Sequence, residues 1–92
     1  MAIACARHIL VKTKDEAEML KKKLAGGAEF DILAQKHSLC KSAKNGGNLG
    51  EFPTGKMLKA FDNIVFKKPV LTVHGPIKTK FGYHLIETIY RN

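Results

Sequence analysis

Two long strand-like runs stand at opposite ends of the chain, and they constrain the fold more than any other feature. Residues 3–12, IACARHILVK, are rich in apolar and β-branched residues and contain no glycine or proline, which is typical of a strand. The last run, YHLIETIYR at residues 83–91, alternates in the same way. A chain of 92 residues has room for one core, so we expect these strands to pair in the middle of one antiparallel sheet. That pairing would bring His8 and His84 close together.

Two helices are expected directly after the first strand. Thr13 and Glu16 form a capping box, in which Thr13 is the N-cap and Glu16 reaches back to it. Two glycines at residues 26–27 end the first helix. A second helix is expected over residues 29–37, because its apolar residues line one stripe.

The second half of the chain predicts shorter elements. Met57, Phe61 and Ile64 recur at the spacing of one helical face, which predicts a short third helix from Met57. Around this helix we expect a polar loop over residues 39–48, a short strand over residues 49–52 and another near residues 77–79. The residues therefore predict an α+β class with the order β-α-α-loop-β-α-β-β, and one domain over residues 1–92.

The chain is strongly basic, with sixteen lysines and arginines against eight acidic residues. Only Arg7 and Arg91 are arginines, whereas proteins that read nucleic acids usually rely on arginine for bidentate contacts. Scattered lysines are more typical of a hydrated surface with weak affinity for polyanions. We therefore expect nucleic-acid binding to be weak or absent.

Other patterns bear on the compartment in which the chain works. The sequence has no apolar run long enough to span a bilayer, and residues 1–6 do not resemble the start of a signal peptide. Cys5 and Cys40 are too few for a disulfide framework, and a reducing compartment would keep both as thiols. These patterns predict a cytoplasmic protein that binds no membrane.

Residues 37–52, HSLCKSAKNGGNLGEF, place a histidine and a cysteine beside a glycine-rich loop, and three kinds of site fit them. A structural zinc site is disfavoured, because His37 and Cys40 form one ligand pair where such a site needs two. A covalent hydrolase would pair Cys40 with His8 or His84, yet the local signature of a cysteine protease does not surround this cysteine. The third kind of site is a binding pocket that uses the thiol without covalent chemistry.

Such a pocket has candidate apolar residues. Leu49, Met57 and Phe61 stand near the glycine-rich loop, on elements that could converge. A methionine and a phenylalanine four residues apart also suit an ordinary core. Beside a cysteine and two histidines, however, a shallow apolar pocket would suit a proline ring.

Several motifs together resemble one enzyme family. They are HILVK at residues 8–12, FDILAQKHSLC at 30–40, GGNLGEF-x-x-G-x-M-x-x-AF at 46–61 and GPIKTKFGYHLI at 75–86. In this combination, which covers essentially the whole chain, the sequence is similar to the parvulin-type peptidyl-prolyl cis-trans isomerases. Its length resembles that of a small stand-alone bacterial parvulin without a partner domain. The resemblance implies a four-stranded antiparallel sheet surrounded by helices, in the order β-α-α-α-β-α-β-β.

The resemblance also implies roles for individual residues. The two family histidines correspond to His8 and His84, which are expected to hydrogen-bond each other beneath the substrate. Cys40 stands at the position where the family has cysteine or aspartate, and Thr79 at a hydroxyl position near the histidines. The implied substrate-binding residues are Leu49, Met57 and Phe61 in the proline pocket and Phe81 on its rim. Two positions depart from the family pattern, Lys41 and Asn48, and they concern the conformation of the loop.

The function implied is isomerisation of unphosphorylated X–Pro bonds in peptides and unfolded proteins, assisting folding, by a monomer without metal or cofactor. Because the family accepts aspartate in place of Cys40, non-covalent catalysis is favoured over nucleophilic attack. The connection after the first strand, Lys12-Thr13-Lys14, is too short for the basic loop of phosphate-specific relatives. Two alternatives are a non-catalytic chaperone module that binds polypeptides and an accessory protein that binds polyanions.

Overall fold

The chain forms one sheet with helices on both faces, and the computed structural model describes residues 2–92. The elements follow in the order β1 (Ile3–Val11), α1 (Lys14–Ala25), α2 (Phe30–His37), the 3₁₀ helix η1 (Lys41–Asn45), β2 (Asn48–Pro53), α3 (Lys59–Val65), β3 (Val73–Thr79) and β4 (Gly82–Arg91). This confirms the α+β class and the order that the resemblance implies. The pattern of residues had missed η1, which lies in the segment expected to be a loop.

The two end strands pair in the middle of the sheet, as the sequence predicts. The strand order is β2-β1-β4-β3, and every neighbouring pair is antiparallel. In the pairing of β1 with β4, His8 lies opposite Ile86 and Leu10 lies opposite His84. His8 and His84 are therefore diagonal neighbours on one face of the sheet, which is close enough for contact.

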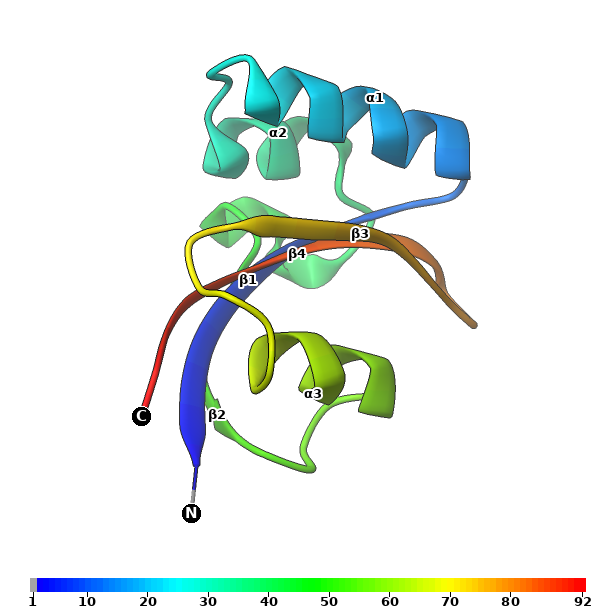
Figure 1. Cartoon of the computed structure of the whole chain (residues 1–92). Coiled ribbons are helices and arrows are strands. Elements are labelled where there is room, and N and C mark those ends of the chain that lie inside the picture. Colours follow the sequence, from blue (N-terminus) through cyan, green and yellow to red (C-terminus); the bar gives the residue numbers. More distant parts are fainter. Residues whose placement is uncertain (1) are drawn as a thin grey trace.

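Each face of the sheet has its own hydrophobic core. Figure 1 shows α1 and α2 on one side of the sheet and α3 on the other. Alternation along β1 sends Ile9 and Val11 toward α1 and α2, and Ala4 and Ala6 toward α3. The core beneath α1 and α2 also contains Ala17, Leu20, Phe30, Leu33, Ala34 and Leu85, and the core beneath α3 contains Phe52, Phe61, Val65 and Ile86.

The helix ends follow the sequence signals in part. Thr13 is the N-cap of α1, and its hydroxyl oxygen accepts a hydrogen bond from the Glu16 N–H at 3.2 Å, as predicted. The third helix begins at Lys59, so the prediction that it starts at Met57 is wrong. Leu58 is extended, with ψ of 149°, and this conformation leaves Met57 in the segment that leads into the helix.

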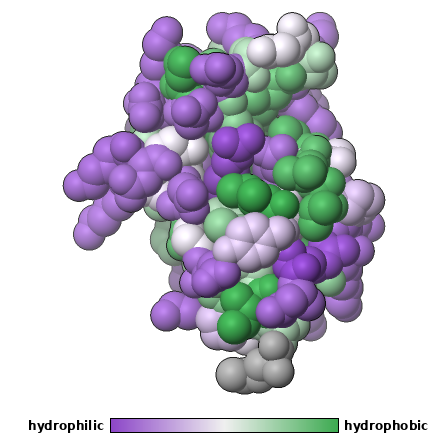
Figure 2. Space-filling model, turned by 90° about the vertical axis from the view of Figure 1, so that its left-hand side faces the viewer, coloured by the Kyte–Doolittle hydropathy of each residue, from purple (hydrophilic) through white to green (hydrophobic). Residues whose placement is uncertain are grey.

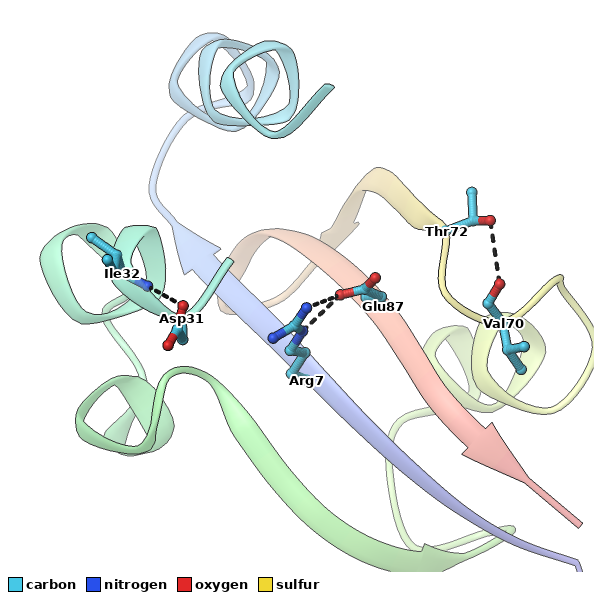
Figure 3. A network of polar contacts seen from close by, with 6 residues as sticks. All are labelled: Arg7, Asp31, Ile32, Val70, Thr72 and Glu87. Atoms are coloured by element: carbon cyan, nitrogen blue, oxygen red, sulfur yellow. Dashed lines mark hydrogen bonds and ion pairs between the residues drawn. The ribbon is translucent and has the colours of Figure 1, made fainter. Parts of the chain in front are cut away.

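An ion pair lies on the face of the sheet that α1 and α2 cover. Figure 3 shows Arg7 of β1 and Glu87 of β4 pointing toward one another, and Arg7 Nη2 lies 2.6 Å from Glu87 Oε1. The Arg7 guanidinium also lies 4.6 Å from the centre of the Phe30 ring. These contacts border a cavity of about 670 Å³, on the opposite face of the sheet from the two histidines.

The surface is mixed in character. Figure 2, which shows the side where the C-terminus lies, has hydrophobic patches between hydrophilic side chains. Within residues 2–92, helices lack the length and apolar character needed to cross a membrane.

The loop between η1 and β2 packs its backbone directly against β1. The His8 N–H donates to the Gly47 carbonyl oxygen at 3.0 Å. A Cβ atom on Gly47 would collide with the carbonyl oxygen of His8, and the φ of Gly47, +84°, also favours glycine. The glycine-rich stretch is therefore part of what holds the loop against His8.

Replacing Gly47 by alanine tests this contact. We expect Gly47→Ala to lower the free energy of unfolding by roughly 2–4 kcal/mol, because the new methyl group adds a collision to the strain of positive φ. Gly50→Ala is the matched control, since Gly50 has φ of +73° and the space that its new methyl group would occupy is open. The control should lose only about 1–2 kcal/mol in urea unfolding. Equal losses in the two variants would contradict the close approach of Gly47 to β1.

Candidate active site

Two buried histidines form the floor of the site. His8 Nδ1 lies 3.2 Å from His84 Nδ1, and the ring planes are only 13° apart, so the two imidazoles meet edge to edge. Their exposed fractions are 4% and 2%. The direct contact that the sequence predicts between these residues is therefore present.

Two hydroxyl groups extend the histidine pair into a chain of four polar side chains. Ser42 Oγ lies 3.2 Å from His8 Nε2, and Thr79 Oγ1 lies 2.7 Å from His84 Nε2. Thr79 Oγ1 also accepts a hydrogen bond from the Phe81 N–H at 3.2 Å. Every ring nitrogen of the pair thus has a partner, so both imidazoles are fixed in orientation.

The surroundings keep both rings neutral at pH 7. Burial lowers the pKa of His8 from 6.5 to about 4, and the nearby His84 ring adds to this effect. Burial also lowers the pKa of His84. Between two neutral rings, one Nδ1 must donate the shared hydrogen bond and the other must accept it. The hydrogen bonds can then run from Ser42 toward Thr79 or in the reverse direction, and both orders pair all four ring nitrogens.

An apolar cavity opens above the histidine floor. Its volume is about 270 Å³, and its lining is almost entirely apolar. Phe61 joins the cavity to the floor, because its ring meets His8 and His84 edge-on with centroid distances of 5.3 and 4.9 Å. Phe81, 58% exposed, lies at the rim. The full lining is His8, Leu10, Cys40, Leu49, Met57, Leu58, Phe61, Phe81 and His84.

Comparison with known proteins places this site in a family. The model of the rotamase family, the PPIC-type PPIase domain, matches residues 8–89, which span the floor and the whole cavity lining. The chain belongs to the PPIC-type peptidyl-prolyl isomerases. This confirms the resemblance to the parvulins that the sequence motifs indicate.

Solved parvulin structures have the same fold. The solution structure of NmPin, the parvulin of Nitrosopumilus maritimus, matches with a TM-score of 0.87 at 41% identity, and the match covers 98% of both chains. The crystal structure of the peptidylprolyl isomerase PrsA from Bacillus anthracis matches with a TM-score of 0.95 at 35% identity. That match covers 99% of this chain and 42% of the PrsA chain.

Curated relatives include longer proteins. The foldase protein PrsA of Geobacillus sp. (strain WCH70) is 47% identical over 83 residues, which is 89% of this chain and 30% of the foldase. The chain therefore spans about 30% of the length of the foldases that it matches.

The isomerase domain brings together all the residues to which the family resemblance assigns a role. His8, Cys40 and His84 line the cavity with the four apolar candidates, and Thr79 lies directly behind His84. Sequence reasoning missed Ser42, Leu10 and Leu58. Ser42 stands two residues after Cys40 in the glycine-rich loop. This closeness in sequence to a candidate cysteine was the one available signal that Ser42 belongs to the site.

Cys40 contributes to the cavity wall without a hydrogen bond to the histidines. Its backbone N–H donates to Ser38 Oγ at 3.4 Å, while the described part of the chain shows no hydrogen bond between its thiol and either imidazole. Both cysteines are free thiols.

The possible zinc pair is not supported by its second member, His37. The Nδ1 atom of His37 lies 3.7 Å from Glu16 Oε2. Among residues 2–92 the histidines, cysteines and acids form no group of three or more that could hold a metal ion.

Proposed function

We propose that this isomerase domain acts on unphosphorylated X–Pro bonds in peptides and unfolded polypeptides, and that it stabilises the twisted amide without a covalent intermediate. The observation that carries the proposal is the apolar cavity of about 270 Å³ whose floor is a neutral, hydrogen-bonded histidine pair. The name foldase, which the PrsA relatives carry, supports a role in protein folding.

The cavity suits the ring side of the prolyl bond. Resonance makes rotation about a peptide bond cost ~18–20 kcal/mol, and an X–Pro bond exchanges its isomers over tens to hundreds of seconds. Leu49, Met57 and Phe61 would hold the proline ring and exclude the water that stabilises the planar, polar amide. Anchoring one side of the bond leaves the other side free to rotate.

The histidine pair would form a rigid and uncharged bottom surface for this pocket. Since both rings are neutral and all four ring nitrogens are occupied, the floor does not present a strongly hydrated cation to the substrate. Both imidazoles hold the Phe61 ring in place through T-shaped contacts. Ser42 and Thr79 act as positioning residues, because they contact the histidines and are not part of the cavity lining.

A non-covalent role suits Cys40. Its thiol belongs to the cavity wall and has no hydrogen bond from a histidine that would act as its base, within the part of the chain described. The family resemblance allows an aspartate here, and a carboxylate replaces a thiol more readily as an electrostatic group than as a nucleophile. The Cys40 side chain would therefore stabilise the displaced atoms of the twisted amide electrostatically.

The substrate class follows partly from the connection between β1 and α1. Only Lys12 and Thr13 separate Val11 from the start of α1, and Thr13 is engaged as the helix cap. This supports a preference for unphosphorylated substrates, since a phosphate clamp needs several converging basic groups on a longer loop. An apolar residue before the proline suits the apolar lining.

The site of action and the assembly state belong to the proposal as well. The free thiols of Cys5 and Cys40 are compatible with a reducing cytoplasm, and we propose a cytoplasmic monomer. Cell fractionation and sedimentation of the purified protein test these two statements directly.

The test of the proposed function is exchange spectroscopy by NMR on X–Pro peptides with the residue before proline varied. We expect the wild-type chain to accelerate cis–trans exchange, with apolar residues before proline preferred over phosphoserine. Met57→Ala should lower kcat/KM by about 10-fold or more, because it removes one wall of the cavity. Peptide binding without acceleration would favour the non-catalytic chaperone module instead.

A pair of substitutions at Cys40 tests the non-covalent role. We expect Cys40→Ala to lower kcat/KM by about 10-fold to 100-fold, because it removes the polar group from the wall. Cys40→Asp should keep a large part of the activity, because a carboxylate still provides a field at the same place. Circular dichroism confirms the fold of each variant. A folded Cys40→Asp protein as inactive as Cys40→Ala would argue for a nucleophilic thiol.

A further inference from the structure

Exposed lysines flank the residues of the apolar cavity in the sequence. Each of four exposed lysines is directly adjacent in sequence to a residue that lines the cavity. We call these four residues the lysine collar: Lys41, Lys56, Lys59 and Lys80. They come from three separate segments, which are η1, the residues that lead into α3 with its first residue, and the turn between β3 and β4.

The collar is close enough to act on a bound peptide. Consecutive Cα atoms are about 3.8 Å apart, so the ammonium groups lie on the order of one Debye length, about 10 Å in 0.1 M salt, from the rim. For Lys80 the contact is direct, because its Nζ atom lies 5.2 Å from the centre of the exposed Phe81 ring. A carboxylate on a chain leaving the cavity would therefore meet positive charge in several directions.

Acidic side chains near the mouth are fewer than the collar lysines. Asp62 follows the cavity residue Phe61, but its Oδ2 atom accepts a hydrogen bond from the Gly55 N–H at 2.7 Å. Glu51 lies two residues after Leu49 in β2, and its carboxylate accepts a hydrogen bond from Tyr90 on the other face of the sheet. Both carboxylates keep their charge, but the four exposed collar lysines outnumber them, so these residues together carry a net positive charge.

The opposite face of the sheet has the reverse balance of charge. The larger cavity there is lined by three acids, Glu29, Asp31 and Glu87, and by two basic residues. Both basic residues are engaged: Arg7 pairs with Glu87, and Lys21 Nζ donates to the Gly75 carbonyl oxygen at 2.6 Å. The cavity on the opposite face therefore lacks the excess of positive charge that the collar has.

We propose that the lysine collar selects X–Pro segments that carry acidic residues on either side of the X–Pro pair. The proposal rests on the proposed function and narrows its substrate class. The apolar cavity receives the proline ring and the apolar residue before it, while the collar attracts carboxylates that stay outside in water. Attraction of this kind mainly raises the rate of encounter, and it weakens as salt is added.

The experiment compares three peptides with the same Leu-Pro core, flanked on both sides by Glu, Gln or Lys. Exchange spectroscopy by NMR avoids a coupling protease, whose own charge preference would interfere. At 25 mM salt we expect kcat/KM for the Glu peptide to exceed that for the Gln peptide by about threefold to tenfold, with the Lys peptide lowest. At 500 mM salt the three values should converge.

Two variants with the same change in net charge distinguish the effect of the collar on peptide selection from the effect of the overall charge. The collar variant replaces Lys41, Lys56, Lys59 and Lys80 by Gln, and the control variant replaces the exposed helix lysines Lys14, Lys22, Lys23 and Lys36 by Gln. We expect the Glu-to-Gln ratio to fall toward one in the collar variant and to persist in the control. Equal ratios in both variants, or a wild-type ratio of one at 25 mM salt, would overturn the proposal.

Peptide titrations followed by amide chemical shifts test the collar independently of turnover. If the protein fails to accelerate exchange of any of the peptides, the proposed function falls, yet tighter binding of the Glu peptide at the collar would still support selection of acidic segments. A single-stranded DNA that displaces the Glu peptide from these residues at lower concentration would overturn the collar as a peptide-selecting device. That result would instead indicate that the collar binds polyanions.

Discussion

The contact between His8 and His84 is the interaction on which the rest of the site depends. It exists because strands from the two ends of the chain pair in the centre of the sheet and place the two imidazoles diagonally on one face. Ser42 and Thr79 complete the hydrogen bonds of the rings, and Phe61 packs against both rings in T-shaped contacts. Burial then makes charge on the rings costly, so the floor is both rigid and neutral.

The two faces of the sheet differ in what they contribute to this small domain. The face under α1 and α2 carries one hydrophobic core and the ion pair between Arg7 and Glu87. The face under α3 carries a second core, in which part of the apolar surface is left open as the cavity. Phe61 belongs to both the core and the cavity, so packing beneath α3 also sets the shape of the binding site.

The sequence predicted those features that local chemistry or strand alternation determines. The end strands, the Thr13 cap and the shared face of His8 and His84 follow from residue types and from a period of two. The roles expected for Cys40 and Thr79 came from the family resemblance and could not come from spacing, because only the folded chain brings Thr79 to His84 and Cys40 into the same cavity as the histidines. Their placement around the cavity agrees with that resemblance.

Other features depend on tertiary contacts that a single sequence does not reveal. Met57 fits a helical period but lies before α3, because the extended Leu58 delays the start of the helix. Ser42 reaches His8 only because η1 and the Gly47 backbone are packed against β1. Cys40 is part of the cavity wall, and in residues 2–92 its thiol has no hydrogen bond to either histidine, which its position in the sequence does not reveal.

The most direct test of the neutral, coupled histidine floor is a pH titration of the assigned imidazole nitrogens by ¹⁵N NMR. An ordinary histidine, with a pKa near 6.5, is mostly protonated at pH 5.5. We predict that His8 is still neutral there and takes up a proton only near pH 4, that the pKa of His84 is also lower than 6.5, and that at pH 7 one Nδ1 of the pair carries a proton while the other does not. Two rings that titrate independently near pH 6.5 would contradict a neutral, coupled floor.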